Sequence, residues 1–74
     1  MSRLVVYYNI AVANESNDAL IREAVGYDET GSGGGFGLRD LSFEVRPEDT
    51  YHIAGSLERL ATIGTIPGLD WEWA

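Results

Sequence analysis

Residues 3–13 have the sequence Arg-Leu-Val-Val-Tyr-Tyr-Asn-Ile-Ala-Val-Ala, which is rich in β-branched and aromatic side chains. This composition predicts a β-strand. The even-numbered positions form a wholly apolar face: Leu4, Val6, Tyr8, Ile10 and Val12. The odd-numbered positions mix apolar and polar side chains. Because strands that are apolar on both faces lie at the centre of a sheet, we expect a central strand whose mixed face is available to a second subunit.

The sequence predicts two helices, one in each half of the chain. Residues 19–25 carry an apolar stripe at helical spacing after a run of polar capping residues, and Gly26 is a suitable C-terminal stop. Pro47 suits the first turn of a second helix, because the N–H that proline lacks has no partner there. Apolar residues then recur at helical spacing as far as Gly64, which predicts a helix that ends at this glycine.

Three further segments are predicted to belong to the sheet. Residues 38–46 and residues 69–73 alternate between apolar and polar side chains, which is typical of half-buried strands. Residues 27–37 contain five glycines, too many for a stiff helix or strand. We therefore expect this glycine-rich segment to form either an irregular edge strand followed by a hairpin turn or a mobile loop.

The predicted order of elements is strand, helix, glycine-rich strand, strand, helix, strand. This order resembles the ferredoxin-like β-α-β-β-α-β arrangement, and the resemblance extends over the whole chain. It implies one α+β domain over residues 1–74, with an antiparallel sheet, two helices on one face and an irregular, glycine-rich second strand. The resemblance assigns no function, because this fold carries many unrelated activities. Iron–sulfur chemistry is excluded because the chain has no cysteine.

The charge of the chain restricts its partners. Its 74 residues include 12 acidic side chains against 5 arginines, for a formal net charge of −7. Because binding to phosphates or to an anionic membrane needs basic side chains, we expect neither direct nucleic-acid binding nor membrane binding. The apolar run at residues 4–8 is too short to cross a bilayer and no leader pattern opens the chain, so we expect a cytoplasmic location.

The small size of the chain leads to a further expectation. A domain of this length buries only about 60% of its unfolded surface. No cysteine is present to form a disulfide. Because self-association is a common remedy for a small core, we expect a homo-oligomer, with a dimer favoured.

The glycine-rich segment is also a candidate binding site for an anion, because backbone N–H groups of such a loop can surround a phosphate. The specific nucleotide-binding motifs do not fit. A P-loop needs a lysine, which the chain lacks, and the dinucleotide motif needs a third glycine where Phe36 stands. A weaker site is predicted within Gly31–Gly37 and beside it: Ser32, Gly33, Gly34, Gly35 and Arg39. An ordinary flexible hairpin explains the same glycines.

No catalytic residue, metal site or cofactor is predicted. His52 is the only histidine, and with Ser56 it lacks the third group that orients a catalytic histidine. A zinc site would need more nitrogen or sulfur ligands. Residues 28–33 match half of a calcium loop, but Arg39 stands where the bidentate acid is required. A small enzyme with a pocket around His52 or Tyr8 is kept as an alternative.

Acidic and aromatic side chains are the candidate partner-binding residues. Carboxylates gathered on one face can bind a basic surface, and tryptophan and tyrosine are common interface anchors. The acidic candidates are Asp40, Glu44, Glu48, Asp49, Asp70 and Glu72, and the aromatic candidates are Tyr7, Trp71 and Trp73. The two tryptophans could equally close the small core or anchor an interface.

We therefore expect a small, acidic, non-catalytic interaction protein that inhibits or regulates a partner by occupying its basic surface. As a class, small α+β chains without cysteines or motifs resemble the accessory and anti-defence proteins of phages and mobile elements. The first alternative is an oligomeric binder that sequesters a nucleotide or another anion through Gly31–Gly37. The second alternative is a small dimeric enzyme of the ferredoxin-like type.

Overall fold

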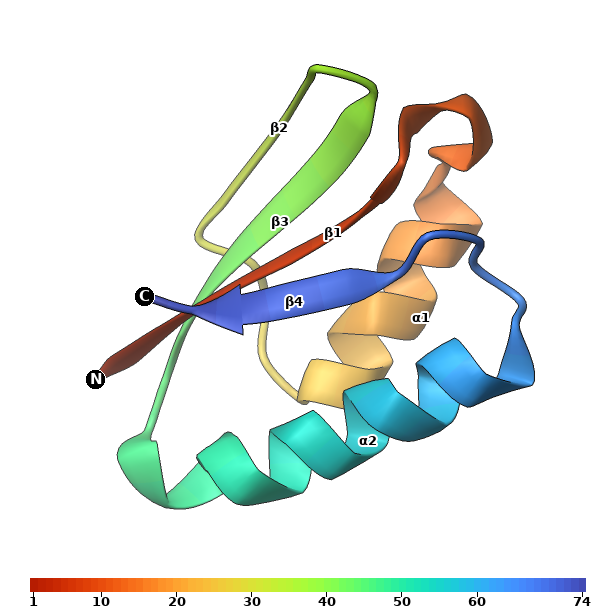
Figure 1. Cartoon of the computed structure of the whole chain (residues 1–74). Coiled ribbons are helices and arrows are strands. Elements are labelled where there is room, and N and C mark those ends of the chain that lie inside the picture. Colours follow the sequence, from red (N-terminus) through yellow and green to blue (C-terminus); the bar gives the residue numbers. More distant parts are fainter.

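The chain forms four strands, two α-helices and two short 3-10 helices in a computed structural model that describes all 74 residues (Figure 1). In chain order these elements are β1 (Ser2–Asn9), η1 (Ile10–Val12), α1 (Glu15–Val25), β2 (Gly31–Gly35), β3 (Leu38–Val45), η2 (Pro47–Asp49), α2 (Thr50–Ile63) and β4 (Asp70–Trp73). Both helices fall short of the length and apolar character that a membrane span requires.

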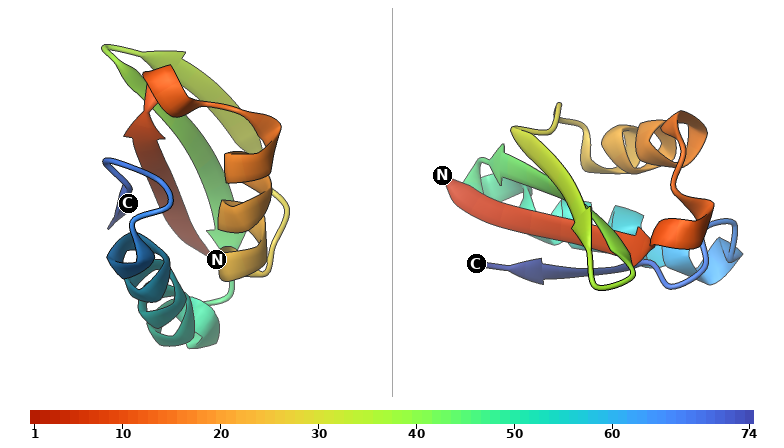
Figure 2. Two further views of the ribbon diagram at one scale, coloured as in Figure 1. Left: turned by 90° about the vertical axis from the view of Figure 1, so that its right-hand side faces the viewer. Right: turned by 90° about the horizontal axis from the view of Figure 1, so that it is seen from above.

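The four strands form one antiparallel sheet in the order β2-β3-β1-β4. β1 has a neighbour on each side, as its apolar composition predicted, and it pairs with β3 along its whole length. Both helices lie on one face of the sheet, and the other face is uncovered (Figure 2). These observations confirm the predicted α+β class. The strand order and the placement of the helices are compatible with the ferredoxin-like arrangement.

The hydrophobic core lies between the sheet and the helices. Alternate residues of β1 and β3 point toward the helices and are buried, as the alternating sequence predicted. The buried apolar cluster consists of Leu4, Val6, Tyr8, Ile21, Val25, Leu41, Phe43, Val45, Ile53, Leu57 and Ile66. Because side chains alternate with a period of two, this core also decides which strand residues face away from the helices.

Both helices end at the glycines that the sequence predicted as their C-terminal stops. Gly26 and Gly64 adopt left-handed φ angles of 79° and 78° at the C-terminal caps of α1 and α2. Pro47 begins η2, the short 3-10 helix that leads directly into α2. Three of the four helix ends are therefore set by the backbone preferences of Gly26, Pro47 and Gly64.

The first strand ends sooner than residue 13, which corrects the predicted boundary. The Asn9 side chain accepts a hydrogen bond from the Ala11 N–H at 2.9 Å, and the chain turns into η1. Asn14 then caps α1 by accepting a hydrogen bond from the Asn17 N–H at 2.7 Å. Asparagine side chains compete in this way with strand pairing, so β1 is shorter and α1 longer than the apolar pattern predicted.

The glycine-rich segment forms β2 and a hairpin, which is the first of the two predicted alternatives. β2 pairs residue by residue with the start of β3. A Cβ atom at Gly34 would lie 3.0 Å from the Cδ1 atom of Ile10, so a larger residue here would force the end of the Ile10 side chain to shift by a few tenths of an ångström. Phe36 and Gly37 form the turn with φ angles of 53° and 80°, the paired positive values of a tight hairpin turn.

Phe36 is expected to destabilise the hairpin, because its bulky side chain occupies a left-handed backbone position and is fully exposed. Asparagine tolerates this conformation better. The substitution Phe36→Asn should therefore raise the free energy of unfolding by about 1 kcal/mol, as measured by urea denaturation. Phe36→Ala removes the ring but keeps the strained backbone and should give no comparable gain. Equal stability of the two variants would contradict this account of the turn.

Candidate functional site

The uncovered side of the sheet presents a set of side chains that we call the open face. It consists of Arg3, Val5, Tyr7 and Asn9 from β1, Leu38, Asp40, Ser42 and Glu44 from β3, and Asp70 and Glu72 from β4. Directly opposed residues of antiparallel strands have their side chains on the same face, about 5 Å apart. Tyr7 is opposed by Asp40 on one side and by Asp70 on the other. The open face therefore has a tyrosine between two carboxylates near its centre.

The open face carries more acidic than basic side chains. Its four carboxylates belong to Asp40, Glu44, Asp70 and Glu72, and its one arginine is Arg3, which gives a formal net charge of −3. None of these five side chains forms an ion pair. The acidic groups of this surface are therefore available to an external cation.

Most arginines are engaged away from the open face. The ion pairs are Arg22 with Glu15 at 3.0 Å and with Glu29 at 2.7 Å, Arg39 with Asp18 at 2.7 Å, and Arg46 with Asp49 at 3.4 Å. Arg59, on α2, donates a hydrogen bond to Ser56. The distribution of these partners, rather than the net charge alone, makes the open face acidic.

The surroundings of Tyr7 on the open face favour the protonated form of its phenol. Partial burial raises the pKa of the Tyr7 phenol, and the negative charges of Asp70 and Glu72 raise it further. The phenol is therefore a neutral hydrogen-bond donor among carboxylates. Its ring also offers an apolar surface on which a cationic side chain can lie.

A shallow hollow of 390 Å³ lies beside Tyr7 on the open face. Its lining residues are Val5, Tyr7, Gly35, Phe36, Leu38, Asp40 and Glu72. The hollow joins apolar side chains to two carboxylates, a combination that suits the aliphatic stem and charged head of a lysine or arginine. Gly35 of β2 has no side chain, so the hollow stays open where it meets this residue.

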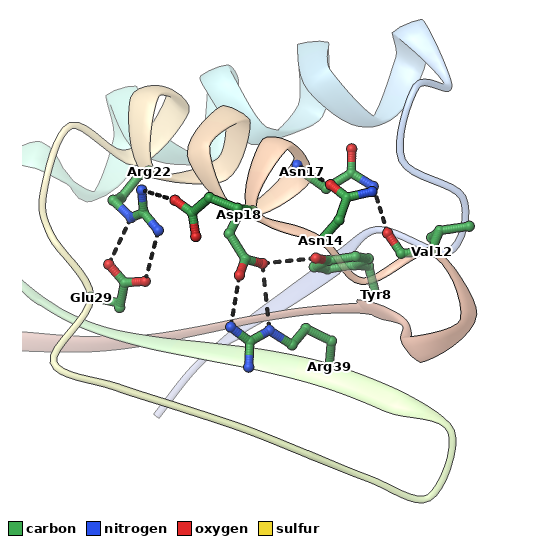
Figure 3. A network of polar contacts seen from close by, with 9 residues as sticks. Tyr8, Val12, Asn14, Asn17, Asp18, Arg22, Glu29 and Arg39 are labelled. Carbon is green, nitrogen blue, oxygen red and sulfur yellow. Dashed lines mark hydrogen bonds and ion pairs between the residues drawn. The ribbon is translucent and has the colours of Figure 1, made fainter.

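The opposite face of the sheet holds a buried polar network (Figure 3). Asp18 of α1 is only 4% exposed. It accepts a hydrogen bond from the Tyr8 hydroxyl at 2.7 Å and another from the Arg39 Nη2 at 2.7 Å. These contacts join α1 to β1 and β3. Because every buried side-chain nitrogen and oxygen atom has a hydrogen-bond partner, the carboxylate is stabilised in the core.

The pKa values of this network shift in the directions expected for a paired carboxylate. Burial acts to raise the pKa of Asp18, but the hydrogen bonds from Arg39 and Tyr8 outweigh burial and hold it below its usual range. Hydrogen bonding to Asp18 raises the pKa of Arg39. Burial and the bond to Asp18 raise the pKa of Tyr8. Asp18 is therefore ionised and Tyr8 protonated at neutral pH.

Sequence reasoning missed this network, although periodicity marks its members. Asp18 precedes Ile21 and Val25 by three and seven residues, the spacing of one helical face. Arg39 is in phase with the buried alternating residues of β3. The available signal was a charged residue at a position where the helical or strand periodicity predicts a buried side chain. Such a residue needs a partner of opposite charge.

The five residues of the predicted anion site are neighbours, but they do not form a loop. Ser32, Gly33, Gly34 and Gly35 lie in the extended strand β2, and Gly34 is opposed by Arg39. The Arg39 guanidinium points to the helix side of the sheet, where Asp18 neutralises it. Anion binding by these residues stays a prediction that this geometry does not favour.

The predicted partner-binding residues fall into two groups. Tyr7, Asp40, Glu44, Asp70 and Glu72 share the open face. The other four, Glu48, Asp49, Trp71 and Trp73, lie elsewhere. Glu48 and Asp49 are in η2, and Asp49 accepts a hydrogen bond from the Tyr27 hydroxyl. Trp71 and Trp73 point to the helix side of β4, where Trp71 packs against the core and Trp73 remains 39% exposed.

His52 and Ser56 line a hollow of 560 Å³ between α1 and α2. The Ser56 hydroxyl accepts a hydrogen bond from the Arg59 Nη2 at 3.1 Å, and the His52 imidazole forms no hydrogen bond. No hydrogen bond joins the two side chains, and the small-enzyme alternative stays a prediction. No group of three or more histidine, cysteine or acidic side chains converges in a way that could hold a metal ion.

The chain was compared with protein-family models, with curated proteins and with solved structures, and none of the three comparisons gave a match. The functional conclusion therefore depends on the geometry and charge of the chain's own surfaces.

The Asp18 network should make stability depend on pH. Asp18→Asn is expected to lower the free energy of unfolding at neutral pH by about 2 kcal/mol, because Arg39 and Tyr8 lose a charged acceptor. The folded pKa of Asp18 is depressed below 3.8, so its contribution is complete above that value and disappears as the pH falls through the folded pKa. Urea unfolding at several pH values measures the difference.

Glu15→Gln is the control for this experiment, because Glu15 also pairs with an arginine but its side chain is 78% exposed. It should change stability by about 0.5 kcal/mol or less. A stability gap between wild type and Asp18→Asn that stayed constant down to acid pH would show that the Asp18 charge is not what stabilises the contact.

Proposed function

We propose that this chain is a small, non-catalytic interaction protein whose open face binds the basic surface of a protein partner. The observation that carries the proposal is the set of unpaired carboxylates on the open face, with Arg3 as their single neighbouring cation. Complementary charge guides such an encounter and suppresses wrong partners. An uncovered sheet face with this charge fits a protein surface rich in arginine and lysine.

The hollow beside Tyr7 supplies the expected anchor point of the interface. An arginine from the partner can lay its guanidinium over the Tyr7 ring and direct its N–H groups to Asp40. Val5 and Leu38 would cover its aliphatic stem. Tyrosine and arginine are frequent at the energetic centre of interfaces, so Tyr7 is proposed as the principal anchor.

Occupation of a basic surface would inhibit or regulate the partner, because a polyanion or acidic protein that uses the same surface is displaced. This mode of action matches the class of phage accessory and anti-defence proteins that the sequence resembles in size and charge, acting in the cytoplasm. It requires no catalytic group in this chain. Inhibition is therefore proposed to follow from occupancy alone.

The first test replaces the four open-face carboxylates with amides. The variant combines Asp40→Asn, Glu44→Gln, Asp70→Asn and Glu72→Gln. At about 0.5 kcal/mol for each lost charge pair, its affinity for the partner should fall more than tenfold. Affinity capture from the cells that express the chain, followed by quantitative mass spectrometry, measures retention of the partner.

A matched variant removes the same charge from the rest of the molecule. Glu23→Gln, Asp28→Asn, Glu48→Gln and Glu58→Gln replace the four other carboxylates that have no ion pair. This variant should retain the partner. Capture should also weaken as salt rises from about 0.1 M to about 1 M, because the Debye length falls from about 10 Å to about 3 Å. Equal losses in the two variants, or binding that ignores salt, would reject the open face as the binding surface.

We also propose that the homo-oligomer expected from the chain's size is a dimer joined through β2. β2 is an edge strand, and four of its five residues are glycine. Charged side chains usually protect such an edge from pairing, and β2 has none. Two copies can therefore pair there without bringing like charges together.

Native mass spectrometry of the untagged chain should give twice the chain mass of 8.1 kDa. A lysine at the β2 edge, Ser32→Lys, is expected to shift the population to monomer. Ser16→Lys makes the same change on the exposed surface of α1 and should leave the dimer intact. A monomeric wild type at every concentration would contradict the proposed dimer.

A further inference from the structure

The other edge of the sheet adjoins an aromatic groove. β4 pairs with β1 alone, so its outer side lies free. The end of β4 and the start of α2 lie at the end of the molecule where β1 begins (Figure 1). Residues of these three segments line a shallow groove of 390 Å³ there. Its lining residues are Ser2, Thr50, Tyr51, Ala54, Trp73 and Ala74.

The two aromatic residues of this groove are unusually exposed for their size. Tyr51 is 92% exposed and Trp73 is 39% exposed, and neither side chain forms a hydrogen bond. Single exposed apolar residues are common on protein surfaces. Here a tryptophan and a tyrosine line one groove beside an unpaired strand, which is the composition of a binding hot spot.

The free edge indicates how a ligand would be held. Along an edge strand, alternate N–H and C=O groups have no strand partner. An extended peptide can pair with these groups, while its alternate side chains enter pockets on the receiving domain. The groove next to Trp73 is positioned to receive side chains on the helix side of such an added strand.

The side chains of β4 decide the chemistry of the added strand. Asp70 and Glu72 point to the open face, and Trp71 and Trp73 point to the helix side. Cross-strand neighbours of opposite charge stabilise a sheet, and like charges directly opposed destabilise it. Residues of the added strand on the open face should therefore be arginine or lysine. Those on the helix side should be apolar.

The same rule argues against a second copy of this chain as the occupant. Antiparallel pairing of two β4 strands centred on Trp71 would oppose Asp70 to Glu72 of the other copy. Pairing centred on Glu72 would oppose two Glu72 side chains. Both registers place carboxylate against carboxylate, so the β4 edge is unsuited to self-association.

We infer that the β4 edge, with the groove of Tyr51, Ala54 and Trp73, binds an extended segment of the protein partner in which basic and apolar residues alternate. The inference rests on the proposed function and names the form in which the partner presents its positive charge. The segment adds a fifth strand to the sheet. Its basic residues extend the contact with the open face at Asp70 and Glu72, and its apolar residues fill the aromatic groove.

The experiment uses fluorescence anisotropy of the full chain with a labelled synthetic peptide of sequence Arg-Val-Arg-Leu-Arg flanked by glycines. The control peptide has the same composition in blocks, Arg-Arg-Arg-Val-Leu. The alternating peptide should bind about tenfold more tightly, because only it can place its charged and apolar side chains on opposite faces. Equal affinity of the two peptides would overturn the inference.

Backbone pairing is tested separately from charge. N-methylation of one alternate set of peptide residues should abolish binding, because those N–H groups point to β4, whereas N-methylation of the other set should leave binding intact. If both methylated peptides bind as well as the parent peptide, strand addition does not occur. The net charge is the same in all three peptides, so charge alone cannot produce the expected difference.

Two variants test the groove itself. Tyr51→Ala and Trp73→Ala should each weaken the alternating peptide about tenfold, and Trp73→Phe should restore most of the affinity. Tyr51→Ala keeps the test valid if Trp73→Ala impairs folding, because Tyr51 is almost fully exposed. Unchanged affinity of Tyr51→Ala and of any folded Trp73→Ala protein would overturn the inference.

The outcome can be separated from that of the proposed function. Asp40 and Glu44 lie on β3, on the far side of β1 from this edge, so the double variant Asp40→Asn/Glu44→Gln should change peptide affinity by less than about twofold. If the peptide does not bind but partner capture still depends on the open-face carboxylates, only the strand-addition inference is overturned. Partner capture that ignores those carboxylates would instead overturn the proposed function.

Discussion

The ion pair between Asp18 and Arg39 joins α1 to the sheet and holds one of the five arginines on the helix side of the sheet. Asp18 is buried at the sheet and is ionised, so it needs a cation with a fixed position. Arg39 supplies it from the buried face of β3, with Tyr8 as a second donor. Asp40, the next residue, points the other way and is left without a counter-ion. The contact that joins α1 to the sheet therefore keeps Arg39 away from the carboxylates of the open face.

Strand alternation extends this division of charge across the whole sheet. In β1, β3 and β4 one side packs on the core or the helices, and the other side carries the polar groups. Asp70 and Glu72 belong to the open face and also to the free edge, so one partner could engage both surfaces continuously. The opposite edge, β2, is bare of charge and suits a second copy of the chain. The two edges thus differ in chemistry, which separates self-association from partner binding.

The elements were predictable from the sequence wherever the signal was local. The apolar composition of β1, the alternation of β3 and β4, and the glycine stops of both helices all act within a few residues. The acidic residues and Tyr7 were identified as candidates, but their convergence on one face depends on the strand order, which brings β4 beside β1. The burial of Asp18 was missed because it depends on a partner 21 residues away in the chain. Trp71 and Trp73 were grouped with the acidic residues by composition, whereas strand alternation places them on the opposite side.

The most direct measurement is an NMR titration of the ¹⁵N-labelled chain with a short oligo-arginine peptide, which maps the bound cation residue by residue. If the open face is the binding surface, the largest amide shifts will lie at Tyr7, Asp40, Asp70 and Glu72. Glu23 and Glu58, which carry unpaired carboxylates on the helices, will shift little. Equal shifts at the helical carboxylates and on the open face would contradict the account, because the peptide would then be responding to net charge rather than to the arrangement of charge on the sheet.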